Sequence, residues 1–147
     1  MKIAIGADHA GFAAKESLRA WLSGKHDIVD CGTSGEEAVD YPDLAQKVAH
    51  LVSSGKADRG ILICGTGIGM CMAANKVRHI RAALCHDRNT AELSRKHNDA
   101  NVLCMGGRLL SPEKIIDITD AWLSAGFEGG RHGRRVEKIG KLEGGSI

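Results

Sequence analysis

Short apolar runs alternate along this chain with segments whose apolar residues recur at helical spacing. Segment 60–64 has no polar alternation, which is typical of a strand covered on both faces. The apolar runs predict five strands, at residues 2–7, 27–31, 58–64, 80–85 and 101–105.

The segments between the runs predict helices, because their apolar residues return every three or four positions. Ser111 followed by Pro112 is typical of an N-cap and the first residue of a helix. The helices are expected from Phe12 to near Gly24, from Pro42 to Ser54, from the glycine-rich turn after Cys64 to Lys76, from Asn89 to Lys96, and from Pro112 to about Ser124.

Strict alternation of strand and helix predicts a three-layer, Rossmann-like α/β fold. We expect a five-stranded parallel sheet flanked by helices, with a C-terminal helical extension. Ligands of such sheets bind beyond the carboxyl ends of the strands. That rule selects Ala7–Gly11, Thr33–Tyr41, Cys64–Gly69, His86–Asn89 and Gly106–Arg108 as the loops that carry function.

Composition narrows the class of protein. A chain of 147 residues fits a single domain, 1–147. A net charge of +2 and an aromatic content of 3% argue against a nucleic-acid partner. No apolar stretch approaches the roughly 18 residues of a membrane span. None of the five cysteines forms a Cys-x-x-Cys pair, so the sequence indicates neither a zinc site nor a redox pair. Reduced thiols are typical of the cytoplasm, where we expect this protein.

The segment Cys64–Gly69 is the strongest candidate for chemistry. Three alternating glycines, Gly65, Gly67 and Gly69, follow a buried strand directly and open a helix. Such a turn lets several backbone N–H groups converge on an anion at the positive end of the helix. A cysteine at this position is placed where the thiolate is favoured.

Three further groups of polar residues have the right chemistry for a phosphorylated sugar. Asp8 and His9 follow the first strand, in a segment that lacks the glycine spacing of a dinucleotide fingerprint. His97 ends a helix and can exchange protons near neutral pH. Arg131 and Arg135 share one face if their segment is helical, and with Arg108 they can hold phosphate. The roles of His86 and His132 stay open.

Five motifs in order resemble the type B ribose-5-phosphate isomerases and their relatives that act on other aldose phosphates. They are GADHAGF at Gly6–Phe12, DYPD at Asp40–Asp43, ILICGTGIGMCMAANK at Ile61–Lys76, LSRKHNDANVLCMGGR at Leu93–Arg108 and FEGGRHGRRV at Phe127–Val136. The resemblance implies interconversion of ribose 5-phosphate and ribulose 5-phosphate through an enediolate, without a metal or organic cofactor.

The resemblance also implies roles for individual residues. Cys64 would be the base, assisted by the Thr66 hydroxyl, and His97 would open the furanose ring. A subgroup of the family has a glutamate base where this chain has Met70, which cannot accept a proton. Substrate contacts are implied for Asp8, His9, Tyr41, Gly65, Gly67, Ile68, Gly69 and Asn98. Phosphate contacts are implied for His9, Arg108, Arg131 and Arg135.

The family builds its sites at a dimer interface, so a homodimer or dimer of dimers with shared sites is implied. The segment at about 127–147 would pack on the partner subunit. Two alternatives stay open: an isomerase of a six-carbon aldose phosphate, such as allose or galactose 6-phosphate, and a non-catalytic sugar-phosphate sensor. A sensor needs the arginines but has no use for a base, so Cys64, Thr66 and His97 favour an enzyme.

Overall fold

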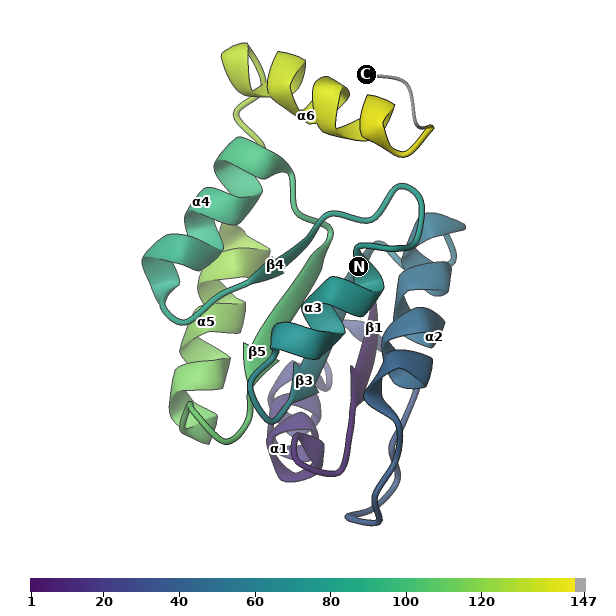
Figure 1. Cartoon of the computed structure of the whole chain (residues 1–147). Helices are drawn as coiled ribbons and strands as arrows, with labels where there is room; N and C mark the ends of the chain where they lie inside the picture. Colours follow the sequence, from purple (N-terminus) through teal and green to yellow (C-terminus); the bar gives the residue numbers. More distant parts are fainter. Residues whose placement is uncertain (145–147) are drawn as a thin grey trace.

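One parallel sheet of five strands, in the order β2-β1-β3-β5-β4, forms the centre of the computed structural model, which describes residues 1–144 (Figure 1). All four neighbouring pairs are parallel, as predicted. The strands are β1 (Lys2–Ala7), β2 (Asp27–Asp30), β3 (Arg59–Cys64), β4 (Ala82–Leu84) and β5 (Val102–Gly106).

Helices cover both faces of the sheet and complete the predicted three layers. The helices are α1 (Phe12–Leu22), α2 (Tyr41–Ser53), α3 (Ile68–Ala74), α4 (Arg88–Asn98), α5 (Pro112–Ser124) and α6 (Arg131–Leu142). Buried residues of α1, α4 and α5 form one core cluster with the sheet, and those of α2 and α3 form another. The predicted α/β fold is therefore confirmed.

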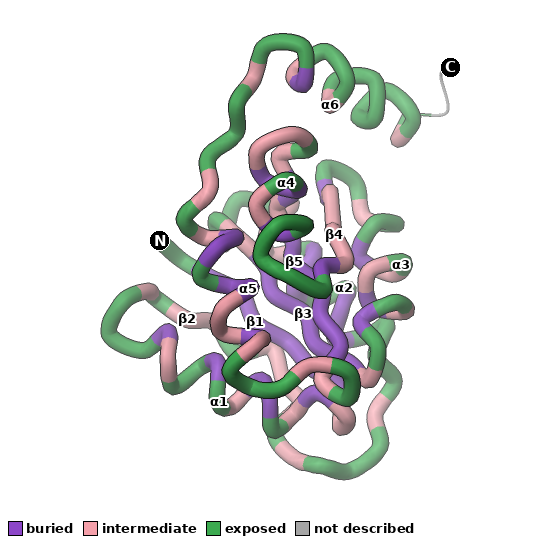
Figure 2. Tube along the Cα trace, turned by 90° about the vertical axis from the view of Figure 1, so that its left-hand side faces the viewer, coloured by how far each residue is buried: buried purple, intermediate pink, exposed green. Residues whose placement is uncertain are grey.

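The central strand β3 shows why its sequence lacks polar alternation. Ile61 and Ile63 belong to the cluster under α1, α4 and α5, whereas Leu62 belongs to the cluster under α2 and α3. Successive side chains of a strand point to opposite faces, and here both faces are covered. Figure 2 shows the central strands as a continuous buried region.

Several boundaries differ from the prediction. The strand expected at 80–85 is reduced to Ala82–Leu84, because the Ile80 N–H bonds the Val77 carbonyl and the Arg81 N–H bonds the Asn101 side chain. The helix expected to reach Lys76 ends at Ala74, where the backbone closes into tighter turns. In contrast, α4 runs beyond Lys96 and carries His97 and Asn98 in its last turn.

The predicted cap of α5 is present, since the Ser111 hydroxyl accepts the Lys114 N–H at 3.2 Å.

The C-terminal extension is α6, which lies apart from the sheet and packs on α4 (Figure 1). Its apolar residues Ile139 and Leu142 are 43% and 59% exposed. Residues 145–147, at the end of the expected domain 1–147 and of the segment 127–147, lie outside the described residues. None of the helices described combines the length and apolar character that crossing a bilayer requires.

Candidate active site

The loops after β1, β3 and β5 pack backbone against backbone at the carboxyl end of the sheet. A Cβ at Gly11 would overlap the Ile63 carbonyl, and a Cβ at Gly67 would lie 2.9 Å from the Met105 carbonyl oxygen. The Gly107 N–H also donates to the Cys64 carbonyl at 2.8 Å. Only glycine permits these approaches, so the three loops form one compact platform.

Cys64 is the last residue of β3 and is only 5% exposed. Its Sγ accepts the Gly67 N–H at 3.1 Å. Gly67 has φ 80°, a left-handed conformation that glycine adopts without strain and that ends the turn before α3. Thr66 is exposed beside them, and its Oγ1 accepts the Ile68 N–H at 3.3 Å. A thiol, a hydroxyl and several backbone donors therefore share this turn.

Asp8 and His9 follow β1 and border the same platform. The Asp8 carboxylate is buried and accepts the Gly11 N–H at 3.0 Å, which fixes the turn into α1. His9 Nδ1 accepts the Val39 N–H at 3.4 Å, from the loop before α2. A neutral His9 with this contact carries its proton on Nε2, so that nitrogen can donate to a ligand.

Tyr41 and Arg108 flank the cysteine turn. Tyr41 begins α2, and a Cβ at Gly69 would lie 2.6 Å from its Cζ. The Arg108 N–H donates to the Gly65 carbonyl at 3.1 Å, and its side chain passes close to Gly65. The carboxyl end thus brings together a first group of predicted site residues: Asp8, His9, Tyr41, Cys64, Gly65, Thr66, Gly67, Ile68, Gly69 and Arg108.

The remaining predicted residues, His97, Asn98, Arg131 and Arg135, form a second group at the opposite end of the sheet. Helix α4 runs back from the carboxyl end of β4, so His97 and Asn98 lie near the start of the strands. The Asn98 carbonyl accepts from Arg81 Nε, just before β4, at 3.2 Å. Figure 1 shows α6 beyond this end of the sheet, far from the β3–α3 turn. One chain alone therefore does not bring the two groups together.

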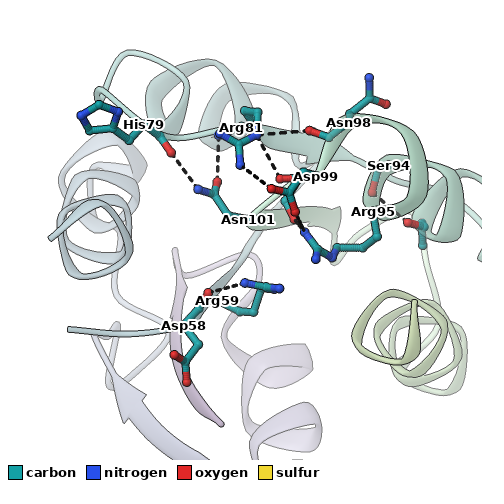
Figure 3. Close-up of polar contacts among 11 residues, drawn as sticks. Asp58, Arg59, His79, Arg81, Ser94, Arg95, Asn98, Asp99 and Asn101 are labelled. Atoms are coloured by element: carbon teal, nitrogen blue, oxygen red, sulfur yellow. Dashed lines mark hydrogen bonds and ion pairs between the residues drawn. The ribbon is translucent and has the colours of Figure 1, made fainter. Parts of the chain in front are cut away.

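A network of charged residues holds the end of α4 and was not found from the sequence (Figure 3). Asp99 caps the helix in a left-handed conformation, with φ 46°. Its carboxylate lies 2.7 Å from Arg95 Nη1 and 3.1 Å from Arg81 Nη2. Arg81 Nε also donates to the Asp99 carbonyl at 3.0 Å. Arg95 and Asp99 are four residues apart at the end of α4, but nothing in the sequence indicated that Arg81 would join them.

His97 has two neighbours that the sequence did not assign to a site. Its ring stacks on that of His132, with centroids 4.1 Å apart. Glu128 Oε2 lies 3.8 Å from the Nε2 atoms of both histidines. Burial, followed by the positive charges of His97 and Arg131, lowers the pKa of His132. The spacing of four between Glu128 and His132 was the available signal for this group.

The thiols differ in pKa. The pKa of Cys71 is lowered to about 7, chiefly by a hydrogen bond from the Cys104 thiol. Burial raises the pKa of Cys85 to about 11. The pKa of Cys104 is raised further, first by its hydrogen bond to Cys71 and then by burial. Cys71 is half-buried in the first turn of α3, directly after the cysteine turn.

The arrangement at the carboxyl end suits proton abstraction beside a carbonyl. A sulfur base there would stand among fixed N–H dipoles, which can stabilise the oxyanion that forms when the proton leaves. The polar side chains of Asp8, His9 and Tyr41 offer hydrogen bonds to hydroxyl groups, and Arg108 offers a cation to phosphate.

Comparison with known proteins gives full-length matches. The family described as Ribose/Galactose Isomerase matches residues 3–139. The chain is 49% identical over 143 residues to ribose-5-phosphate isomerase B of Escherichia coli (strain K12), covering 97% of this chain and 96% of that protein. It is 47% identical over 146 residues to D-erythrulose-4-phosphate isomerase of Pectobacterium atrosepticum, covering 97% and 95%.

Among solved structures, ribose-5-phosphate isomerase B of Clostridium thermocellum superposes with a TM-score of 0.97 at 51% identity, covering 99% of both chains. The similarity therefore includes every element that carries a candidate site residue.

Proposed function

The chain belongs to the ribose/galactose isomerase family, and we propose that it interconverts ribose 5-phosphate and ribulose 5-phosphate with Cys64 as the base. The observation that carries this proposal is the position of the Cys64 thiol. It ends the central strand inside a turn of backbone donors, with the Gly67 N–H 3.1 Å from its sulfur.

The proposed reaction moves one proton between neighbouring carbons. The Cys64 thiolate removes the proton from C2 of the open-chain aldose, and the electron pair moves toward the C1 carbonyl to give an enediolate. The hydroxyl proton of the C2 oxygen passes to the C1 oxygen, so that the C2 oxygen becomes the carbonyl of the ketose, and the cysteine thiol returns its proton to C1. Met70 stands where a subgroup of the family has a glutamate base, and its side chain, fully buried in the core, cannot accept a proton.

The enediolate needs stabilisation, because a proton beside a carbonyl is only weakly acidic. We assign this task to the backbone N–H groups of Gly65–Gly69 and to the Thr66 hydroxyl. Losing one donor of this kind typically costs about 10²–10³ in rate. We assign Asp8, His9 and Tyr41 to the sugar hydroxyls.

The opposite location of the two groups of site residues supports a shared site between copies of this chain. Within one chain, His97 and Cys64 lie at opposite ends of the sheet. We propose that a second copy places His97 and Asn98 beside the first copy's Cys64, where His97 opens the furanose ring. Arg131 and Arg135 would reach the phosphate in the same way, joining Arg108 and His9.

The exposed face of α6 fits this arrangement. Ile139 and Leu142 are apolar, exposed and carried by a helix that packs mainly on α4. We therefore propose a homodimer in which the segment at about 127–147 packs on the partner.

We place the enzyme in the cytoplasm, because the proposed reaction needs a free thiol and all five cysteines are unpaired.

A second candidate substrate is the four-carbon pair of D-erythrose 4-phosphate and D-erythrulose 4-phosphate. It is favoured by the 47% identity to a D-erythrulose-4-phosphate isomerase. The same base and the same turn would serve both substrates, because the proton moves between the same two carbons.

The test is ketose formation by purified protein from ribose 5-phosphate, erythrose 4-phosphate, allose 6-phosphate and galactose 6-phosphate in turn. We expect the highest kcat/KM with ribose 5-phosphate and a loss of at least about 100-fold in Cys64→Ala. Cys31→Ala is the control, since Cys31 is also a free cysteine but follows β2, outside the turn. Full activity of Cys64→Ala would contradict the mechanism, and preference for another sugar would change the substrate.

A further inference from the structure

The contact between α4 and α6 gathers three groups that can ligate a metal. His97, Glu128 and His132 each offer one ligand atom, and these atoms lie within 4.8 Å of one another. His97 comes from the last turn of α4, Glu128 from the loop before α6 and His132 from the first turn of α6. Two imidazoles and one carboxylate are a usual ligand set for zinc and its neighbours in the periodic table.

The distances from the carboxylate to the two imidazoles fit a single ion. Zinc binds imidazole nitrogen at about 2.0–2.1 Å, so two ligand atoms of one ion stand at most about 4.2 Å apart. Both Nε2 atoms lie 3.8 Å from Glu128 Oε2, inside that limit. The two rings are stacked and parallel within 5°, so they must turn out of this stack for both lone pairs to reach one ion.

The backbone holds the three groups in register. The Glu128 N–H donates to the Lys96 carbonyl at 3.0 Å, which ties the loop before α6 to the last turn of α4. Glu128 and His132 stand on either side of the start of α6, with Glu128 Oε2 3.8 Å from His132 Nε2. The site is therefore largely assembled before any ion arrives, which lowers the entropic cost of binding.

The electrostatics allow an ion of moderate affinity. Neutral imidazole is the form of histidine that binds metals. The charge of Glu128 attracts a cation, whereas the nearby Arg131 and Arg135 oppose it. This balance favours transition metals, which gain from imidazole ligation, over magnesium and calcium, which prefer oxygen.

We propose that His97, Glu128 and His132 bind one divalent transition-metal ion and that this ion inhibits the enzyme. The inhibitory part rests on the proposed function, in which His97 exchanges a proton with the ring oxygen of the sugar. An ion on the His97 imidazole occupies the lone pair that accepts this proton. The metal is thus an inhibitor that competes with ring opening and has no part in the proton transfer at Cys64.

Binding is tested by titrating the full chain with Co²⁺ and following its visible absorption. We expect one ion per chain without a thiolate-to-cobalt charge-transfer band. Glu128→Gln and His132→Gln should each weaken binding more than about tenfold, since loss of even an outer-sphere partner commonly costs 10–100-fold. His79→Gln is the matched control, because His79 pairs with Glu143 at 3.5 Å and has no second histidine in that pair.

Three binding outcomes would overturn the site: unchanged affinity in Glu128→Gln and His132→Gln, equal weakening in His79→Gln, or a thiolate band at one equivalent of Co²⁺. Circular dichroism of each variant shows whether it has kept its fold.

The inhibitory role is tested with ribose 5-phosphate, by comparing each protein with its own metal-free rate. Co²⁺ should slow the wild type at concentrations near its Kd, and Glu128→Gln should need more than about tenfold more ion. Binding without inhibition would overturn the inhibitory role. A protein that binds Co²⁺ but isomerises no sugar phosphate without metal would contradict the proposed function and leave the metal site standing.

Discussion

Arg81 and Asp99 are joined twice, through a side-chain ion pair of 3.1 Å and through a hydrogen bond of 3.0 Å from Arg81 Nε to the Asp99 carbonyl. Arg81 precedes β4 and Asp99 ends α4, so this double contact ties the helix that carries His97 to the edge of the sheet. Asp99 also neutralises Arg95, whose side chain is 5% exposed.

Asp99→Asn should therefore destabilise the protein by roughly 3 kcal/mol, because it leaves the buried Arg95 charge without a counterion. Asparagine tolerates the left-handed backbone at this position, so the variant isolates the loss of charge. The measurement is the free energy of unfolding in urea. Asp117→Asn is the control: its pair with Arg88 is 38–47% exposed and should be worth less than about 1 kcal/mol. Equal losses in the two variants would refute the buried-charge argument.

Gly69→Ala should lower kcat/KM at least about tenfold and change stability little. The new Cβ would meet the Tyr41 ring at 2.6 Å, and Tyr41, which is 40% exposed, can swing outward. A ring that has moved no longer borders the cysteine turn. The check is a double-mutant cycle with Tyr41→Ala: after the ring is removed, Gly69→Ala should have almost no further effect. Additive losses would show that the alanine acts elsewhere.

Alkylating reagents directed at Cys64 should also modify Cys71. Its lowered pKa of about 7 means that the thiolate forms at lower pH than in an ordinary cysteine. In Cys64→Ser, we expect iodoacetamide to label Cys71 before Cys85, at a rate that rises with pH and levels off above about pH 8. Mass spectrometry of peptides identifies the labelled site. Preferential labelling of Cys85, whose pKa is raised to about 11, would contradict this order.

His97→Asn should separate ring opening from proton transfer. Ribose 5-phosphate is mainly a furanose, whereas erythrose 4-phosphate cannot form one because its C4 oxygen carries the phosphate. We expect the variant to lose about 100-fold or more with ribose 5-phosphate and less than about tenfold with erythrose 4-phosphate. The comparison is made as the ratio of kcat/KM values, each relative to wild type. Equal losses with both sugars would assign His97 a role other than ring opening.

Mixing two variants that are each inactive with ribose 5-phosphate tests the shared site. If His97 of one copy serves Cys64 of another, Cys64→Ala and His97→Asn subunits that exchange in solution will form hybrids with one intact site. Random exchange should restore about one quarter of the wild-type activity. The control is a mixture of Cys64→Ala with a Cys64→Ala/His97→Asn double variant, which contains no intact site. Failure to recover activity, despite hybrids seen by native mass spectrometry, would show that sites are not shared.

The sequence predicted the sheet and its covering helices well because buried strands and amphipathic helices leave periodic signals. It was less successful for features that depend on contacts between residues far apart in the sequence. The strand at 80–85 shrank because the Asn101 side chain takes the Arg81 N–H, a contact between residues twenty positions apart. Arg95 and Asp99 are neighbours through helical spacing, but Arg81 reaches Asp99 only because β4 and the end of α4 lie side by side, which local periodicity does not encode.

For the candidate site, motif order and resemblance selected the residues, but spatial grouping came from topology. The direction of α4 decides that His97 lies away from Cys64. Burial decides that His132, rather than the exposed His86, joins His97. Neither the direction of a helix relative to a distant loop nor the burial of a single histidine can be obtained from spacing along the chain.

The backbone contacts at Gly11 and Gly67 limit how this enzyme can diverge. Neither position has space for a side chain, because the backbone of a neighbouring loop lies too close. A substitution in one loop of the platform therefore requires the neighbouring loop to move as well. We expect new substrate preferences to arise from exposed side chains beside the platform, such as Ile68. The residues that shape the platform are therefore fixed by packing, whereas the residues that set substrate preference are free to vary.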